Sequence, residues 1–387
     1  MSGISPFGMQ KHSIHILLLI VSALLVLGVV MLFSTSAFAQ DSHGDIYFFV
    51  KRQILWLGIG LGVAVFAANM DYHFWERTWW IWFGGAFVLL LLCFVPPVGL
   101  RINGSSRWIN IGIGTLQPSE VAKIGALFFL AWWFSKFEST SQGFLMGFLA
   151  PMGILGILLV PIVFEVDIGN TALIGATGLV MLFVAGAALR GLLLLGALGV
   201  TGVFLLAMNI TERQGRLLAF LHPEKYPNEF YQQLQGLIAF GSGGMSGLGL
   251  GEGRQKMLYT PYAHTDFIFP MIGEELGLRI TLVTTAGYLL LCLCGCLVAT
   301  NARDRFGLLL GFGAVMMITF QAVVNIGVTT ALLPNKGMPL PFISYGGSNL
   351  MVCLFMIGIL INIHRQGKPL VPRLAPALLT AKIQPRL

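Results

Sequence analysis

The sequence predicts an all-α polytopic membrane protein with about ten transmembrane helices. The 387 residues are 56% hydrophobic and only 10% charged, and the mean hydropathy is +0.83. A soluble domain has about 25% charged residues, so this composition excludes an ordinary soluble protein. The apolar residues also form long runs, and a membrane-spanning helix needs about 20 mostly apolar residues.

The apolar runs are predicted to be helices because they lack the polar alternation of a barrel strand, and because lipid requires backbone hydrogen bonds to close within each segment. A motif at 36–41 imitates a secretory cleavage site. The run before it is about twice as long as the apolar core of a signal peptide, so we expect a retained first helix. The predicted spans are 14–35, 46–69, 78–96, 118–135, 143–163, 170–187, 191–210, 267–299, 306–332 and 347–364.

An even number of spans places both termini on one side of the membrane. If the N-terminus is cytoplasmic, the cytoplasmic segments carry an excess of basic residues, such as Lys11, Arg303 and Arg305, in agreement with the positive-inside rule. We therefore predict one integral membrane domain over 1–387, with both termini cytoplasmic and a cytoplasmic tail at 365–387.

Three outward segments, 97–117, 211–266 and 333–347, are longer than simple connections. The second, between helices 7 and 8, is too long for an idle loop, and its residues 229–240 show the helical spacing of an interfacial amphipathic helix. The third is rich in proline and glycine, and irregular backbone at membrane depth survives only when it is buried in protein or lines a wet cavity. These features predict a polar cavity on the outer side.

Two patterns that suggest a cofactor are better explained by packing. The glycine-rich stretch 241–253 lacks the Gly-Lys-Ser/Thr ending of a phosphate loop, so we expect a flexible or closely packed turn at the bilayer surface. The five cysteines all fall in predicted spans. Alternate helical positions point about 200° apart, so Cys292, Cys294 and Cys296 cannot converge on one metal ion.

Ionisable residues inside spans cost at least about 2.5–3.5 kcal/mol each, so their partners matter. Glu120 and Lys123 share a helix face at i and i+3; they form either a structural ion pair or a pair bordering the cavity, with Lys123 offering a cation to an anionic ligand. Glu275 and Arg279, at i and i+4, are expected to neutralise each other. Glu274 has no obvious partner in the sequence.

Several polar residues stand at predicted helix starts, where they are expected to cap the backbone. Asp167 or Asn170 would cap the sixth span and Ser348 the last. Thr265 or Asp266 would cap the span that begins at Phe267.

Basic residues gather on the outer side, which the topology does not require. They suggest an anionic ligand outside the membrane, and a lipid-linked phosphate fits. His264 is expected to orient Asp266 or to bond to it, since no second histidine lies at metal spacing. The outer basic residues are Arg101, Arg107, Arg213, Arg216, Lys225, Arg254, Lys256 and Lys336.

Three long stretches resemble the signature regions of the SEDS family (shape, elongation, division and sporulation). They are SSRWINIGIGTLQPSEVAKI, GLGLGEGRQKMLYTPYAHTDFIFPMIGEELG and LPNKGMPLPFISYGGSNL, and the resemblance covers 51–365. GRQK and LPFISYGG are more similar to the division member of the family than to the elongation member. Two positions depart from the family pattern: Pro261 is followed by Tyr262 instead of Glu, and EVDIGN replaces Glu-Pro-Asp-Leu-Gly-Thr around Asp167.

The resemblance implies a peptidoglycan glycosyltransferase that polymerises lipid II at the outer face of the bacterial cytoplasmic membrane during cell division. It implies membrane lipid and a polyprenyl-diphosphate-linked glycan as ligands, and no nucleic acid. Its implied partners are a class B penicillin-binding protein, which is a transpeptidase, and other divisome proteins. The essential aspartate of the family falls on Asp266.

The implied reaction inverts the anomeric centre, so one displacement suffices. It needs a base on the acceptor hydroxyl and positive charge on the departing diphosphate. We expect Asp266 to be the base, with no certain cofactor and no resident metal site, although a divalent cation (Mg or Mn) bound through Asp266 or Glu120 is an alternative. The expected substrate-binding residues are Glu120, Lys123, Arg107, Arg254, Lys336, Ser344 and His264.

Two other functions stay open. A lipid II flippase also needs a polar cavity, but it needs a path to the inner leaflet, and the predicted cytoplasmic loops are short. A non-catalytic divisome scaffold needs no charge within the membrane, so neutralising Asp266 would be harmless to it.

Overall fold

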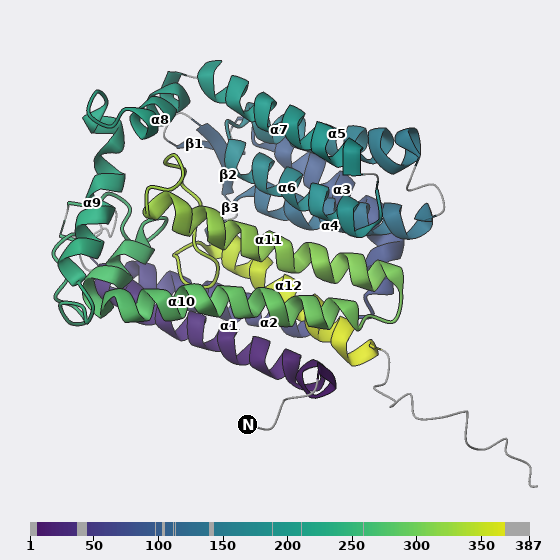
Figure 1. Cartoon of the computed structure of the whole chain (residues 1–387), viewed down its shortest axis with the longest axis horizontal. Helices are drawn as coiled ribbons and strands as arrows, with labels where there is room; N and C mark the ends of the chain where they lie inside the picture. The colour runs from purple at the N-terminus through teal and green to yellow at the C-terminus, as the bar shows by residue number, and fades with distance from the viewer. Residues whose placement is uncertain are drawn as a thin grey trace, which may run out of the picture.

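The computed structural model describes residues 6–36, 45–96, 98–102, 105–110, 112, 114–138, 143–187, 189–209, 211–257 and 259–367. Within these ranges the chain is a bundle of long helices that run side by side, with one small sheet (Figure 1). Most of the cleavage-like motif, 37–41, and the tail beyond Gly367 lie outside the described residues.

Each predicted span coincides with a helix. By length and composition, six of the helices in the described ranges are apolar enough to cross a membrane: α1, α2, α5 with its preceding π-helical turn, α10, α11 and α12. The other four predicted spans lie in the same bundle as α3, α4, α6 and α7. The spanning helices are α1 (Pro6–Ser36), α2 (Phe48–Asn69), α3 (His73–Leu92), α4 (Pro118–Lys136), α5 (Ala150–Phe164, after a π-helical turn at Leu145–Leu149), α6 (Ile168–Val184), α7 (Leu189–Asn209), α10 (Ile268–Thr300), α11 (Arg305–Thr329) and α12 (Gly347–Gln366).

The beginning of α1 and the end of α12 lie at the same end of the bundle (Figure 1), as an even number of spans requires. The opposite end, which we call the loop end, carries the small sheet and two further helices, α8 (Thr211–Leu221) and α9 (Pro227–Gly243). Helix α9 confirms the helix predicted at 229–240. The predicted outward segments therefore share one end.

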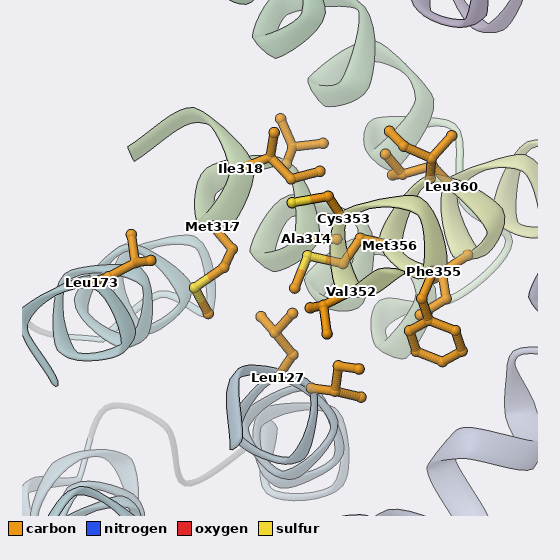
Figure 2. Packing of buried hydrophobic residues seen from close by; sticks show 14 of the residues in the cluster. Leu127, Leu173, Ala314, Met317, Ile318, Val352, Cys353, Phe355, Met356 and Leu360 are labelled. Atoms are coloured by element: carbon orange, nitrogen blue, oxygen red, sulfur yellow. The ribbon is translucent and has the colours of Figure 1, made fainter. Parts of the chain in front are cut away.

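The centre of the bundle is formed by α4, α11 and α12, which are buried on most of their faces. Figure 2 shows Leu127 of α4 and Leu173 of α6 packed with residues of α11 and α12, among them Met317 and Val352. A helix that is apolar all round is stable only when neighbouring helices cover it. This explains why these three helices form the core.

The small antiparallel sheet was not predicted, because 97–117 has the composition of an irregular outer segment. Its strands are β1 (Gly99–Ile102), β2 (Ser105–Asn110) and β3 (Thr115–Leu116), in the order β1-β2-β3. β2 contacts α4, and β3 contacts α12. The sheet therefore covers part of the loop end.

The structure corrects two predictions about charges and caps. Glu275 does not pair with Arg279: Gly277 has a left-handed backbone (φ 80°) that breaks α10 between them, and Glu275 instead bonds to Lys256 at 2.7 Å. Ser348 does not cap α12, whose first flanking residue is Gly346 without a side-chain cap.

Candidate functional site

The site is built around Asp266, which lies just before α10 and is half-buried. The Thr265 hydroxyl donates to Asp266 Oδ1 at 3.0 Å, and Asn325 Nδ2 donates to the Asp266 carbonyl at 2.8 Å. A Cβ added to Gly337 would lie 3.0 Å from Asp266 Oδ2. No side chain caps α10, so the capping interpretation of Thr265 and Asp266 is wrong.

The Asp266 carboxylate is a stronger base than a free aspartate. Burial raises its pKa above the ordinary value of 3.8, while the hydrogen bond from Thr265 and the charge of Arg216 on α8 only partly offset that rise. Burial disfavours the charged form of an acid, and a pKa nearer to the working pH makes a better general base. The position of Asp266 therefore suits proton abstraction.

His264 lies in an aromatic cluster beside Asp266 and is 8% exposed. Its ring centroid is 4.3 Å from that of Phe49 and 6.0 Å from that of Tyr345, and its carbonyl accepts the Tyr345 N–H at 3.0 Å. These contacts join α2, the segment before α10 and the segment before α12. They fix the segment that precedes Asp266, and the role of His264 in orienting Asp266 stays a prediction.

Lys336 precedes Gly337, which lies beside the Asp266 carboxylate, and the Lys336 side chain also approaches Asp167. A Cβ on Gly169 would lie 2.9 Å from Lys336 Cε. Burial alone would raise the Asp167 pKa, but the charges of Arg107 and Lys336 and hydrogen bonds from Asn170 lower it below its ordinary value. As predicted, Asp167 caps α6 through the Asn170 N–H. The Asp167 side chain also accepts hydrogen bonds from Gln117, Ser119 and Asn170 side chains.

Arg107 on β2 holds the turn between α5 and α6. Its Nε donates to the Glu165 carbonyl at 3.0 Å and its Nη2 to the Val166 carbonyl at 2.7 Å. Val166 has φ 62°, a conformation that is strained for a β-branched residue. Burial, together with the charge of Asp167, raises the pKa of Glu165 to about 8. Arg107 therefore brings positive charge to a turn with two carboxyl groups.

The predicted ion pair between Glu120 and Lys123 is confirmed. Lys123 Nζ lies 2.8 Å from Glu120 Oε1, and the two side chains are 1% and 2% exposed. Lys123 also donates to Gln321 at 2.8 Å, and Asn349 donates to Glu120 at 3.0 Å. In this conformation neither charge is open to a ligand.

The pair is nevertheless linked to Asp266 through α11. Gln321 Nε2 donates to the Pro339 carbonyl at 2.8 Å, and Asn325 Nδ2 donates to both the Met338 and Asp266 carbonyls. Sequence reasoning missed Gln321 and Asn325. Two amides four residues apart in an apolar span were the available signal, because buried polar groups in a membrane helix need partners.

For two predicted site residues, the hydrogen bonds in the structure go to partners other than Asp266. The Arg254 side chain is exposed. The Arg254 backbone N–H donates to the Glu274 side chain at 2.9 Å, so Glu274 has a partner that the sequence did not reveal. Ser344 is buried, and its hydroxyl accepts the Leu340 N–H at 2.8 Å. Neither side chain is directed to the carboxylate by a contact in the structure.

The described residues around Asp266 and Glu120 do not form the donor set that a divalent cation bound through Asp266 or Glu120 would need. Among the described residues, no group of three or more His, Cys, Asp or Glu side chains could hold a metal ion. Glu120 is already bonded to Lys123 and Asn349.

Comparisons with known proteins show which family the chain belongs to. A family model described as cell cycle protein (FtsW, RodA, SpoVE) matches residues 15–369. The probable peptidoglycan glycosyltransferase FtsW of Geobacter metallireducens is 42% identical over 93% of this chain and 96% of its own. The stage V sporulation protein E of Bacillus subtilis is 38% identical over 93% and 99%.

Solved structures agree with the sequence relatives. A chain of a peptidoglycan synthase complex matches with a TM-score of 0.73 and 26% identity, over 90% of this chain and 96% of that one. The rod shape determining protein RodA of Thermus thermophilus matches with a TM-score of 0.66 and 27% identity, over 91% and 96%. The predicted helical membrane fold and the resemblance to the SEDS proteins are both confirmed: this multi-pass membrane protein belongs to the FtsW/RodA/SpoVE family of cell cycle proteins.

Proposed function

We propose that the protein is a peptidoglycan glycosyltransferase that polymerises lipid II during cell division. The observation that carries the proposal is Asp266, a half-buried carboxylate with a raised pKa at the start of a membrane helix, beside the segment that carries Lys336 and Gly337. Relatives over nearly the whole chain are named as peptidoglycan glycosyltransferases, which supports the same activity here.

In the proposed step, Asp266 removes the proton from the 4-hydroxyl of the incoming lipid II sugar. The hydroxyl oxygen attacks the anomeric carbon of the lipid-linked glycan, and the bond from that carbon to the diphosphate oxygen breaks. The diphosphate leaves with the bonding electron pair, so the α-linkage becomes a β-1,4 linkage by a single inversion. A carboxylate acts as such a base when its pKa is raised towards the working pH.

The leaving diphosphate needs positive charge, and we assign Lys336 first. It immediately precedes Gly337, which lies beside the Asp266 carboxylate, so its backbone lies near the proposed reaction centre. Arg107 and Arg216 add charge at the edges of the site. Lys123 is sealed in its ion pair, and we assign it a supporting role through α11 instead of contact with phosphate.

The loop end is proposed to face the outside of the cytoplasmic membrane, where lipid II is presented. The excess of basic residues in the segments at the opposite end, such as Arg303 and Arg305, supports this orientation, because cytoplasmic segments carry more lysine and arginine than outer ones. A class B penicillin-binding protein is the proposed partner, together with other divisome proteins. A structural relative is part of a synthase complex for polymerization and crosslinking, which supports such a pairing.

The proposal can be tested with the purified protein, both alone and together with its co-expressed transpeptidase. With lipid II in detergent it should form glycan strands that a muramidase digests. A leaflet-resolved lipid II assay in vesicles should show no transfer between leaflets. Transfer without glycan formation would support a flippase instead, and neither activity in a folded complex would support a scaffold.

A further inference from the structure

Helix α10 is broken close to the proposed catalytic residue, and the break is closed by a distant part of the chain. Gly277 has φ 80° and ψ 177°, and this non-helical backbone ends a short first segment of α10 at 268–276. Nine residues of α-helix span about 13 Å. Asp266 therefore stands at one end of a short rod, and the break stands at the other.

The glycine-rich loop satisfies the backbone groups that the break exposes. Leu248 and Gly249 donate their N–H groups to the carbonyls of Glu274 and Glu275 at 2.9 and 3.0 Å, and the Leu278 N–H donates to the Gly244 carbonyl at 2.9 Å. Unpaired backbone groups inside a membrane protein are costly. The loop predicted as a flexible or closely packed turn is therefore closely packed.

The approach of the two backbones leaves no space for side chains. A Cβ on Gly277 would collide with the Gly247 nitrogen, and a Cβ on Gly247 would collide with the Glu275 carbonyl. Both glycines also have positive φ, which only glycine adopts without strain. Their identity is thus required by this contact.

A buried ion pair stabilises the same contact between the glycine-rich loop and the break in α10. Lys256 Nζ lies 2.7 Å from Glu275 Oε1, and the two side chains are 1% and 0% exposed. Lys256 also donates to the Ser34 hydroxyl and the Gly251 carbonyl, both at 2.7 Å. Ser34 Oγ and the Gly251 N–H in turn donate to Glu275. The pair thereby joins α1, the loop and α10.

We infer that Lys256 and Glu275 are positioning residues for Asp266. They hold the loop at 243–256 against the break of α10, and we call this contact the lock. The lock fixes the end of segment 268–276 that lies next to Gly277. Asn325 fixes the opposite end of this segment, because its side-chain amide donates a hydrogen bond to the Asp266 carbonyl. With both ends fixed, the carboxylate cannot shift along the helix axis relative to the segment that carries Gly337.

The inference rests on the proposed function only for its effect on rate, because the mechanical link is measurable by itself. A misplacement of about 1 Å at a reacting group can lower a rate on the order of 100-fold. Lys256→Met is expected to lower kcat for lipid II polymerisation by that order while KM changes less than about twofold, since Lys256 is buried in its ion pair with Glu275. Ser34→Ala removes the hydrogen bonds of Ser34 with Lys256 and Glu275 without leaving a charge unpaired, and a smaller fall in kcat is expected.

Hydrogen exchange of the full-length protein in detergent supplies the second readout, with Lys225→Met as the matched control at an exposed lysine of the same outer segment. Lys256→Met and Ser34→Ala should speed exchange at 247–257 and also at 262–268, whereas the control should match the wild type. Faster exchange confined to 247–257, or an unchanged kcat in a folded Lys256→Met protein, would overturn the inference. Should Asp266→Asn keep its activity, the assigned base would be wrong, yet exchange at 262–268 would still decide whether the lock holds that segment.

Discussion

The ion pair between Glu120 and Lys123 allows a quantitative test of how the bundle supports the site. Lys123→Met removes the cation but leaves Glu120 buried with Asn349 as its remaining partner. Removing one partner of a buried ion pair costs about 3–5 kcal/mol. At roughly 2 °C per kcal/mol for a large chain, we expect the melting temperature to fall by about 6–10 °C.

The double variant separates lost pairing from lost packing. Glu120→Gln with Lys123→Met leaves no unpaired charge, and neutral replacement of a buried pair is often close to neutral for stability. We therefore expect the double variant to recover at least half of the melting temperature lost in Lys123→Met. Thermal unfolding in detergent, followed by tryptophan fluorescence in all four forms of the cycle, measures this coupling.

The same variants decide between the two interpretations of Lys123 that the sequence left open. A buried structural pair predicts that the double variant keeps a near-normal KM for lipid II. Additive losses of stability, or a Lys123→Met protein that melts like the wild type, would refute the structural reasoning. A large rise of KM in the stable double variant would instead mean that Lys123 contacts the substrate.

Three further predictions concern the surroundings of the site. Because Arg216 lowers the raised pKa of Asp266, Arg216→Met should move the acidic limb of the pH–rate profile to higher pH, whereas Lys225→Met should leave it in place. The pKa of Glu165 rises from 4.5 to about 8 on folding, so the folded state holds the proton of Glu165 more tightly and loses stability as pH rises from about 4.5 to about 8. Glu165→Gln should therefore raise the melting temperature more at pH 8 than at pH 5. An equal change at both pH values would contradict this reasoning. Asn325→Leu removes the amide donor from the buried Met338 carbonyl and from the partly buried Asp266 carbonyl, at about 1–3 kcal/mol for a buried group left unpaired, and should lower both the melting temperature and kcat. A loss of stability with normal kcat would show that Asn325 does not position Asp266.

The sequence was sufficient to predict the helices because the hydrophobic signal is local. Each span is a continuous apolar run, and lipid leaves the helix as the favourable conformation for it. The pairing of Glu120 with Lys123 was predictable for the same reason, since both lie on one helix face. Asp167, which caps the helix that follows it, was likewise a local feature.

What depended on distant segments was not predictable from local patterns. Glu275 satisfied every rule for a pair with Arg279, but the left-handed backbone at Gly277 separates them and Lys256 replaces Arg279. Gln321 and Asn325 acquire a role only when the segment at 338–339 folds against α11. The small sheet is also fixed by its packing on α4 and α12.

The most direct measurement of the central claim is the rate of glycan formation by Asp266→Asn. The carboxamide preserves the size and shape of the side chain but cannot take up the acceptor proton. General-base catalysis contributes roughly 100- to 10,000-fold, so the purified variant should lose at least about 100-fold in kcat while its melting temperature stays within about 2 °C of the wild type, the shift expected for roughly 1 kcal/mol. A folded variant that still polymerises lipid II at more than about a tenth of the wild-type rate, a loss well below the range for a general base, would contradict the account.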